Sequence, residues 1–266
     1  MIHPTAVIHP QAKLGENVQV GPHAVIDAGV ELGAACVVGP HAYITGRTVA
    51  GARNKFHAGC VIGGIPQDLK YKGDPTSLRI GDDNTFREGV TVNCSTSMEG
   101  VTKIGSNNLL MACAHVGHDS DVGDQVIIAN CSALGGHVTV GDRSVISACV
   151  VIHQFVRIGT LVMIQGGSAI SQDLPPFTVA QNGINRLCGL NIIGLRRAGL
   201  TSDERLELKR VYHALFRSGK NLREAVAEGR KQFAGPTAQQ MLDFVAASKR
   251  GICRHAGRSE AESEGK

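Results

Sequence analysis

The chain has 266 residues, of which 27 are Lys or Arg and 23 are Asp or Glu, giving a formal net charge of +4. Aromatic residues make up only 4% and tryptophan is absent, which excludes a core built on aromatic side chains. No run of about 18 apolar residues occurs, and the first residues lack a charged-then-apolar signal. We therefore expect no transmembrane segment and no secretory signal. Nothing resembles a nucleic-acid-binding motif, so we expect no nucleic acid partner.

An aliphatic residue recurs every six positions over most of the first 170 residues. This period fits neither a 3.6-residue helix nor an alternating strand and predicts a hexapeptide β-helix. Three hexads close a triangular coil, so each inward side chain stacks on the residue 18 positions away, at about 4.8 Å per coil. Glycine and small residues flank the aliphatic position, as expected where a larger side chain would clash at a corner. The longest unbroken series is Ile104, Leu110, Val116, Val122, Ile128, Leu134, Val140, Ile146, Ile152, Ile158, Ile164 and Ile170.

The predicted fold class is a β-solenoid, a left-handed parallel β-helix of hexapeptide repeats followed by a small α-helical C-terminal domain. Hexad coils are known to wind left-handed, although the period itself does not show the hand. The repeat covers residues 1–180 and is interrupted by inserted loops at 64–79 and 94–102. A bridging segment follows at 181–200, then a helical domain at 201–256. Residues 257–266 are small and charged, and we expect them to be disordered.

Three helices are predicted after residue 200. Thr201 and Glu204 form a capping box at the start of the first helix, and Gly219 ends it. Asn221 and Thr237 are expected to cap the second and third helices.

Charge divides unevenly along the chain. Residues 1–200 hold 14 basic and 14 acidic residues, whereas residues 201–266 hold 13 and 9. A basic helical part attracts acidic partners. The candidate contacts are Arg217, Lys220 and Arg223.

The eight cysteines do not indicate disulfides. Cys113, Cys131 and Cys149 are spaced by 18, and side chains stacked in one direction are poorly placed for the disulfide dihedral. No CxxC pair occurs. Reduced thiols predict a cytoplasmic protein.

The richest chemistry is a histidine cluster that spans about two coils. None of these residues takes an inward position, so we expect them to project from the surface. A histidine accepts a proton from a hydroxyl near neutral pH. Asp119 would fix its tautomer, and the Gly136 N–H would donate to a developing oxyanion. The cluster consists of His115, His118, His137 and His153.

A zinc site is the rival interpretation, because three histidines suit that metal. His115 and His118 would point in different directions from one extended strand unless a corner intervenes. We therefore expect no metal and no cofactor, and metal analysis of the purified protein would test this.

At these residues the chain resembles the acyl-(acyl carrier protein)–UDP-N-acetylglucosamine O-acyltransferases, which catalyse the first committed step of lipid A synthesis. The resemblance runs to about residue 252. Its most specific motifs are Gln67-Asp68-Leu69-Lys70-Tyr71, Asn108-Leu109-Leu110-Met111, Ala114-His115-Val116-Gly117-His118-Asp119, His153-Gln154-Phe155, Gln172-Asp173-Leu174-Pro175-Pro176 and Asn191-Ile192-Ile193-Gly194-Leu195-Arg196-Arg197.

The resemblance implies that His118 is the general base for the sugar 3-hydroxyl, that Asp119 supports it and that Gly136 supplies the oxyanion-hole amide. It implies acyl carrier protein and UDP-N-acetylglucosamine as partners, a homotrimer, and a chain-length gauge at Gly166. Arg197 suits the nucleotide end because guanidinium pairs well with phosphate. The implied substrate-binding residues are Gln67, Asp68, Lys70, His115, His137, His153, Gln154, Gly166, Asn191 and Arg197.

The main departures from the family pattern are at four positions: Asn93 replaces a histidine, Cys94 an arginine, Ile193 a glutamate and Ala198 an arginine. They leave open an acyltransferase that acts on an amino group of another nucleotide sugar. A zinc-dependent hexapeptide enzyme and a non-catalytic scaffold are further alternatives. A homotrimer also follows from geometry, because one flat prism face gives no deep pocket for a nucleotide sugar and a fatty chain.

Overall fold

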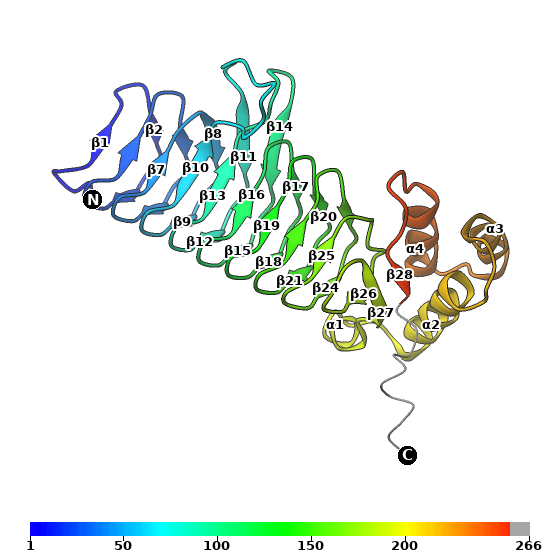
Figure 1. Cartoon of the computed structure of the whole chain (residues 1–266). Helices are drawn as coiled ribbons and strands as arrows, with labels where there is room; N and C mark the ends of the chain where they lie inside the picture. Colours follow the sequence, from blue (N-terminus) through cyan, green and yellow to red (C-terminus); the bar gives the residue numbers. More distant parts are fainter. Residues whose placement is uncertain (256–266) are drawn as a thin grey trace.

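The computed structural model describes residues 1–255, which form a long stack of parallel coils ending in a group of helices (Figure 1). Most strands are two residues long, and Val7 pairs with Val25 at the predicted spacing of 18. The three-hexad coil is therefore confirmed. The predicted tail at 257–266 lies outside the described residues.

The strands form three sheets, one for each face of the prism, which we call faces A, B and C. Face B holds β1 (Val7–Ile8), β4 (Val25–Ile26), β7 (Tyr43–Ile44), β10 (Val61–Gly64), β13 (Thr91–Asn93), β16 (His115–Val116), β19 (Ala133–Leu134), β22 (Val151–Ile152) and β25 (Ala169–Ile170). Face C holds β2 (Lys13–Leu14), β5 (Glu31–Leu32), β8 (Arg47–Ala50), β11 (Ser77–Ile80), β14 (Val101–Ile104), β17 (Asp121–Val122), β20 (Thr139–Val140) and β23 (Arg157–Ile158).

Face A has the most strands, because the chain returns to it near the C-terminus. It holds β3 (Gln19–Val20), β6 (Val37–Val38), β9 (Lys55–Phe56), β12 (Thr85–Phe86), β15 (Leu109–Leu110), β18 (Ile127–Ile128), β21 (Val145–Ile146), β24 (Met163–Ile164), β26 (Thr178–Ala180), β27 (Arg186–Leu190) and β28 (Arg254–His255).

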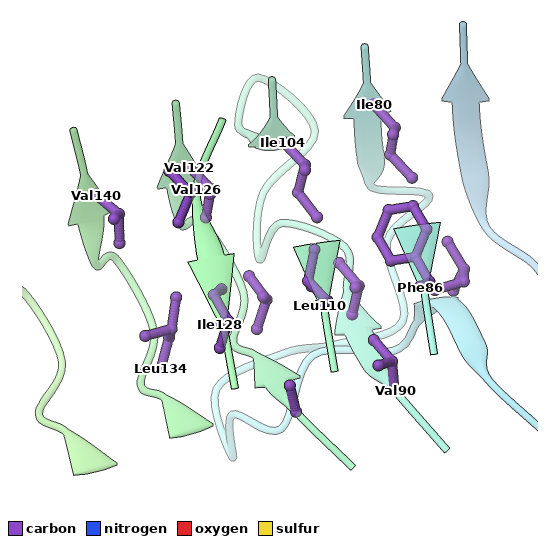
Figure 2. Close-up of a cluster of buried hydrophobic side chains, with 14 of the residues drawn as sticks. Ile80, Phe86, Val90, Ile104, Leu110, Val122, Val126, Ile128, Leu134 and Val140 are labelled. Carbon is purple, nitrogen blue, oxygen red and sulfur yellow. The ribbon is translucent and has the colours of Figure 1, made fainter. Parts of the chain in front are cut away.

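The interior of the prism is a stack of mostly aliphatic side chains from all three faces, with Phe86 among them (Figure 2). Leu110, Ile128 and Leu134 are fully buried. Burying such a side chain stabilises the fold by about 1.5–3 kcal/mol. Ile2 occupies the corresponding position at the start of the repeat but is 54% exposed, because it lies in the first coil at the open end of the prism.

Glycine recurs after the inward residue because neighbouring coils approach closely there. A Cβ added to Gly141 would lie 2.6 Å from the backbone nitrogen of Thr160 in the next coil. The left-handed corner positions, in contrast, are mostly held by other residues, with φ of 60° at Cys113 and 56° at Arg143. The expected clash is present, but it arises between coils rather than from the turn itself.

Two loops interrupt the stack, between β10 and β11 and between β13 and β14. Thr85 pairs with Lys55, 30 positions away, and His115 with Thr91, 24 positions away, because the loops lengthen these coils by twelve and six residues. The Asn93 side chain, at the base of the second loop, donates to the Ile65 carbonyl in the first (2.9 Å). The two loops therefore meet beside face B.

The helices are α1 (Ile192–Arg197), α2 (Ser202–Phe216), α3 (Leu222–Gln232) and α4 (Pro236–Ala246). The predicted capping box of Thr201 and Glu204 and the cap at Asn221 are confirmed. α2 ends three residues before Gly219. None of the described helices is long and apolar enough to cross a membrane.

The prediction that Thr237 caps the last helix is wrong. Gly235 is the N-cap and Pro236 begins α4, so Thr237 lies inside its first turn. Proline suits this position because its missing N–H would have no helical partner there.

Candidate active site

The histidine cluster lies at the corner where face B turns into face C. This corner follows β16 at Gly117–Ser120 and recurs 18 and 36 residues later, after β19 and β22. His118, Gly136 and Gln154 therefore stack in successive coils, and the next position of each coil holds Asp119, His137 and Phe155. The corner also explains how residues close in sequence point in different directions.

His118 is hydrogen bonded to Asp119 at the centre of this corner. Its Nδ1 lies 2.9 Å from Oδ2 of Asp119. His118 is only 8% exposed, so the expectation that it projects from the surface is wrong. The cause is the stacking of coils, since the ring packs against Gly136 of the next coil.

The Asp119 carboxylate is held by the second inserted loop as well. It accepts hydrogen bonds from the Thr96 hydroxyl (2.7 Å) and from the Thr96 backbone N–H. Burial acts to raise the pKa of Asp119, but the hydrogen bonds from His118 and Thr96 outweigh it and hold the pKa below its ordinary value. The carboxylate is therefore ionised at neutral pH.

An ionised carboxylate only accepts hydrogen bonds, so Nδ1 of His118 carries the hydrogen and Nε2 keeps its lone pair in the neutral ring. A Cβ added to Gly136 would lie 2.5 Å from that Nε2. Glycine therefore leaves the basic nitrogen of His118 accessible. The Gly136 N–H has no hydrogen-bond partner among the described residues.

A cavity of about 390 Å³ opens onto His118 and Gly136. His115 lies on its wall, with its Nδ1 2.7 Å from the Thr91 hydroxyl. Burial and the nearby His118 lower the pKa of His115, so this ring is neutral near pH 7. The cavity is lined by Gln67, Asn93, His115, Gly117, His118, Ala133, Leu134, Gly135, Gly136, Val151, Ile152, His153 and Gln154.

His137 lies one coil beyond Asp119 and stacks on Phe155, with ring centroids 4.4 Å apart. Its Nε2 is 3.6 Å from Oδ2 of Asp119. His118, Asp119 and His137 are thus close enough to be considered as metal ligands. Two ligand atoms bound tetrahedrally to one zinc ion at about 2.0–2.2 Å lie more than about 3.2 Å apart, however, whereas the 2.9 Å contact of His118 with Asp119 fits a hydrogen bond.

Not every candidate residue lines this cavity. Asp68 and Lys70 lie on the first loop, where the Asp68 carboxylate accepts from the Lys70 backbone N–H (2.8 Å). Gly166 lies at the corner between faces A and B. Its φ is not left-handed, and the left-handed residue is its neighbour Gly167, so Gly166 is not needed for the turn.

Asn191 and Arg197 line a second cavity, of about 680 Å³, at the corner between faces C and A. Ile193 and Ala198, two of the departures from the family pattern, line it too. Asn191 is fixed there because it caps α1 and donates to the Leu161 carbonyl (2.9 Å). Within one chain, this cavity and His118 lie at opposite edges of face C.

Thr96, Thr91 and Arg250 were not among the predicted site residues. Thr96 and Thr91 bond Asp119 and His115 from coils that are shifted by the loops, so a simple 18-residue count does not pair them. An Arg250 nitrogen lies 3.3 Å from Nδ1 of His153, and 97 residues separate the two in sequence. The only sequence signal was the polar composition of the second insertion.

Hexad coils with a histidine–aspartate pair on a cavity define the class of hexapeptide-repeat transferases. A family model described as "Bacterial transferase hexapeptide (six repeats)" matches residues 11–46. A second model, "Udp N-acetylglucosamine O-acyltransferase; Domain 2", matches residues 173–253. The two models cover the repeat and the C-terminal part, which agrees with the fold.

Comparison with full-length relatives identifies the family within this class of transferases. The acyl-(acyl-carrier-protein)–UDP-N-acetylglucosamine O-acyltransferase of Myxococcus xanthus is 45% identical over 95% of this chain and 99% of that protein. The UDP-N-acetylglucosamine acyltransferase structures from Bacteroides fragilis and Campylobacter jejuni superpose with TM-scores of 0.92 and 0.90, at 40% and 35% identity. Each covers 96% of this chain and 100% of the other. The chain belongs to the acyl-(acyl carrier protein)–UDP-N-acetylglucosamine O-acyltransferase family.

The predicted resemblance, the acyltransferase class and the left-handed parallel β-helix with its small helical domain are thereby confirmed.

Proposed function

We propose that this chain transfers a (3-hydroxy)fatty acyl group from acyl carrier protein to the 3-position of UDP-N-acetylglucosamine, the first step of lipid A biosynthesis, with His118 as general base. The observation that carries the residue assignment is the His118–Asp119 pair, whose free nitrogen faces a cavity walled by Gly136. The two substrates are the ones that the names of the relatives give.

The geometry supports a general-base reaction. Nε2 of His118 takes the proton of the sugar hydroxyl while the hydroxyl oxygen bonds to the thioester carbon. The Gly136 N–H donates to the developing oxyanion, which such amides stabilise by preorganisation. The C–S bond then breaks, and the imidazolium returns its proton to the departing thiolate. Asp119 stabilises the imidazolium throughout.

Substrate positioning divides between the two cavities. We assign Gln67, His115, His137, His153 and Gln154 to the sugar and acyl groups beside the base, with Asp68 and Lys70 on the loop above them. We assign Asn191 and Arg197 to the nucleotide. Gly166 is proposed to limit the acyl chain length.

A homotrimer would unite these two groups of residues. On face C, seven outward strand residues are charged: Lys13, Glu31, Arg47, Arg79, Lys103, Asp121 and Arg157. On faces A and B the charged strand residues are Lys55 and, on β27 and β28 at the C-terminal end of face A, Arg186 and Arg254. Apolar faces favour contact and charged faces favour water, so faces A and B would pack against neighbouring copies.

Packing face A of one copy on face B of the next brings two different corners together at the outer rim. The corner between faces C and A, with Asn191 and Arg197, would meet the corner with His118 of the adjacent copy. Each of three sites would then be composite. The corner with Cys113, Cys131 and Cys149 would lie at the threefold axis.

We propose a cytoplasmic location. All eight cysteines are free thiols, as expected in a reducing compartment. In this mechanism Nδ1 of His118 is hydrogen bonded to Asp119 and no metal takes part. A chelator should therefore leave turnover unchanged.

Product mass spectrometry tests the proposal. Purified protein is incubated with acyl carrier proteins of several chain lengths and with UDP-N-acetylglucosamine or its 3-amino analogue. An ester of UDP-N-acetylglucosamine is expected. An amide with the analogue alone, or no product from any donor, would contradict it. Sedimentation equilibrium tests the trimer, and an active monomer would exclude it.

A further inference from the structure

The basic excess of the C-terminal part is not spread over its helices. Residues 201–247 hold eight Lys and Arg against six Asp and Glu, whereas residues 248–255 hold three and none. Figure 1 shows that this short segment, which ends in β28, returns from α4 to the end of the coil stack. The densest positive charge therefore lies on the solenoid.

The helix cations named as docking candidates are largely engaged within the chain. Arg217 donates to the His255 ring (3.1 Å) and lies over Tyr212. Lys220 is paired with Glu228. Lys220 therefore has its charge balanced by a carboxylate, and the Arg217 side chain is held by partners within the chain.

Three arginines at the end of the solenoid lack such compensation. Arg186 on β27 and Arg254 on β28 are exposed, and they lie opposite each other in the register of these two strands. Arg250 follows α4 and donates to the Ser171 carbonyl (3.1 Å). No carboxylate among residues 1–255 forms an ion pair with any of the three. We call Arg186, Arg250 and Arg254 the arginine patch.

The arginine patch adjoins the candidate active site. Arg186 and Arg254 line a cavity of about 410 Å³ together with Ser171 and Gln172. These two residues lie one coil beyond His153 and Gln154, which line the cavity of the base. Arg250 spans the step, since it contacts both His153 and Ser171.

The distance to the base is short. His118 and Gln172 occupy the same position three coils apart, which is about 14 Å at about 4.8 Å per coil. A carrier protein delivers its thioester on a flexible arm, so its body must stop some distance from the reacting carbon. The patch lies at such a distance along the same edge of the prism.

We propose that the arginine patch, rather than the faces of α2 and α3, docks the acidic surface of the acyl carrier protein. This inference rests on the proposed function, because it assumes that donor. Arginine suits the role because its planar fork forms paired hydrogen bonds to carboxylates. Exposed charge pairs of this kind govern the association rate and its salt dependence.

The test is charge reversal with a matched control. Arg254→Glu and Arg186→Glu should each raise KM for the acyl carrier protein about tenfold in low salt and leave KM for the UDP-sugar unchanged. Lys209→Glu on α2 makes the same charge change away from the patch and should alter neither constant by more than about twofold. High salt should shrink the effect, because the Debye length falls to about 3 Å at 1 M.

Direct binding separates docking from catalysis. Surface plasmon resonance with carrier protein bearing no acyl group should show the same loss for Arg254→Glu. The inference is overturned if Arg223→Glu on α3 weakens binding more than Arg254→Glu, or if both substrates are affected equally. If the wild-type protein acylates the UDP-sugar with none of the acyl carrier proteins as donor, the proposed function itself is overturned instead.

Discussion

Two corners between faces B and C hold a hydrogen-bonded carboxylate, and they differ in what holds it. Near the N-terminus, Asp27 accepts from the hydroxyls of Tyr43 (2.5 Å) and Thr45 (2.7 Å). In the middle of the stack, Asp119 accepts from the Thr96 hydroxyl and from His118. A hydroxyl ends the first network, whereas an imidazole with a second nitrogen extends the other network into a cavity. The same carboxylate arrangement is structural in one corner and suited to catalysis in the other.

The inserted loops add to this difference. The coil of Asp27 itself contains no insertion, and its carboxylate is bound by Tyr43 of face B and Thr45 of the adjoining corner. Asp119 is reached by Thr96 from the second loop, and Gln67 of the first loop lines the cavity. A regular stack of hexads makes flat faces, and the inserted loops add to the wall of the cavity beside Asp119.

Substitution of the base should separate the two corners most sharply. His118→Ala should lower turnover about 10²–10⁴-fold, the usual cost of removing a general base. Asp27→Ala should leave turnover unchanged and lower the free energy of unfolding by about 1 kcal/mol. Steady-state kinetics and urea unfolding measure both. Near-normal turnover in folded His118→Ala protein would refute the mechanism.

An added methyl group at Gly136 should have the next largest effect. Its Cβ would lie 2.3 Å from Cε1 of His118, so the ring must move from its place beside Asp119. Gly136→Ala should reduce kcat at least tenfold with little change in the far-ultraviolet circular dichroism. At Gly64 the nearest atom to an added Cβ is 3.4 Å away, and Gly64→Ala should stay within twofold. If Gly136→Ala and Gly64→Ala lowered kcat equally, the loss would not come from displacement of the His118 ring.

Thr96→Val removes the hydroxyl that donates to Asp119. It should reduce kcat/KM about tenfold, since a hydrogen bond to a charged group contributes about 1.5–3 kcal/mol. Thr96→Ser should restore most of it. The folded-state pKa of Asp119 is depressed, so its stabilising contribution is present above the unfolded pKa of about 3.9 and is lost as pH falls through the folded value. The stability difference between wild type and Thr96→Val should therefore be full at pH 7 and shrink as the pH falls through the depressed folded-state pKa of Asp119. A difference independent of pH would mean that Thr96 acts without Asp119.

Gly166→Met should change selectivity more than rate. A methionine there would shorten the proposed acyl slot, and each methylene that no longer fits forfeits about 0.8 kcal/mol. Competition between donors should show a preference for shorter chains with their turnover retained. The Cβ would lie 3.1 Å from the Ala148 carbonyl, so a small loss of stability is expected. Unchanged preference would end the chain-length assignment.

Much of the fold is predictable because the hexad period acts locally. Each inward aliphatic residue is chosen by the same 18-residue repeat, so a count along the chain identifies most of the core, from Val20 to Ile170. The helix caps at Thr201 and Asn221 depend only on neighbouring residues, and they too were predictable. Thr237 failed as a cap because the preceding Gly-Pro already begins the helix.

The chemistry of the site was only partly predictable. The grouping of His115, His118 and Gly136 follows from the period, since 18 residues return the chain to the same corner. The burial of His118 does not, because it depends on how closely the next coil packs against the ring. Thr96 reaches Asp119 only because a loop changes the spacing between coils.

The sequence by itself determined the repeat, the identity of the inward residues and the candidate base with its carboxylate. Each of these depends only on residues within one or two coils of each other. Tertiary structure alone decided that Nε2 of His118 faces a cavity, that Asn191 and Arg197 lie across face C from it, and that the arginine patch adjoins His153. Those relations join residues tens of positions apart, and their distances depend on the stacking of coils, on the loops and on the return of the chain after α4. The physical reason is that a local period fixes which way a side chain points, whereas only packing fixes what it meets.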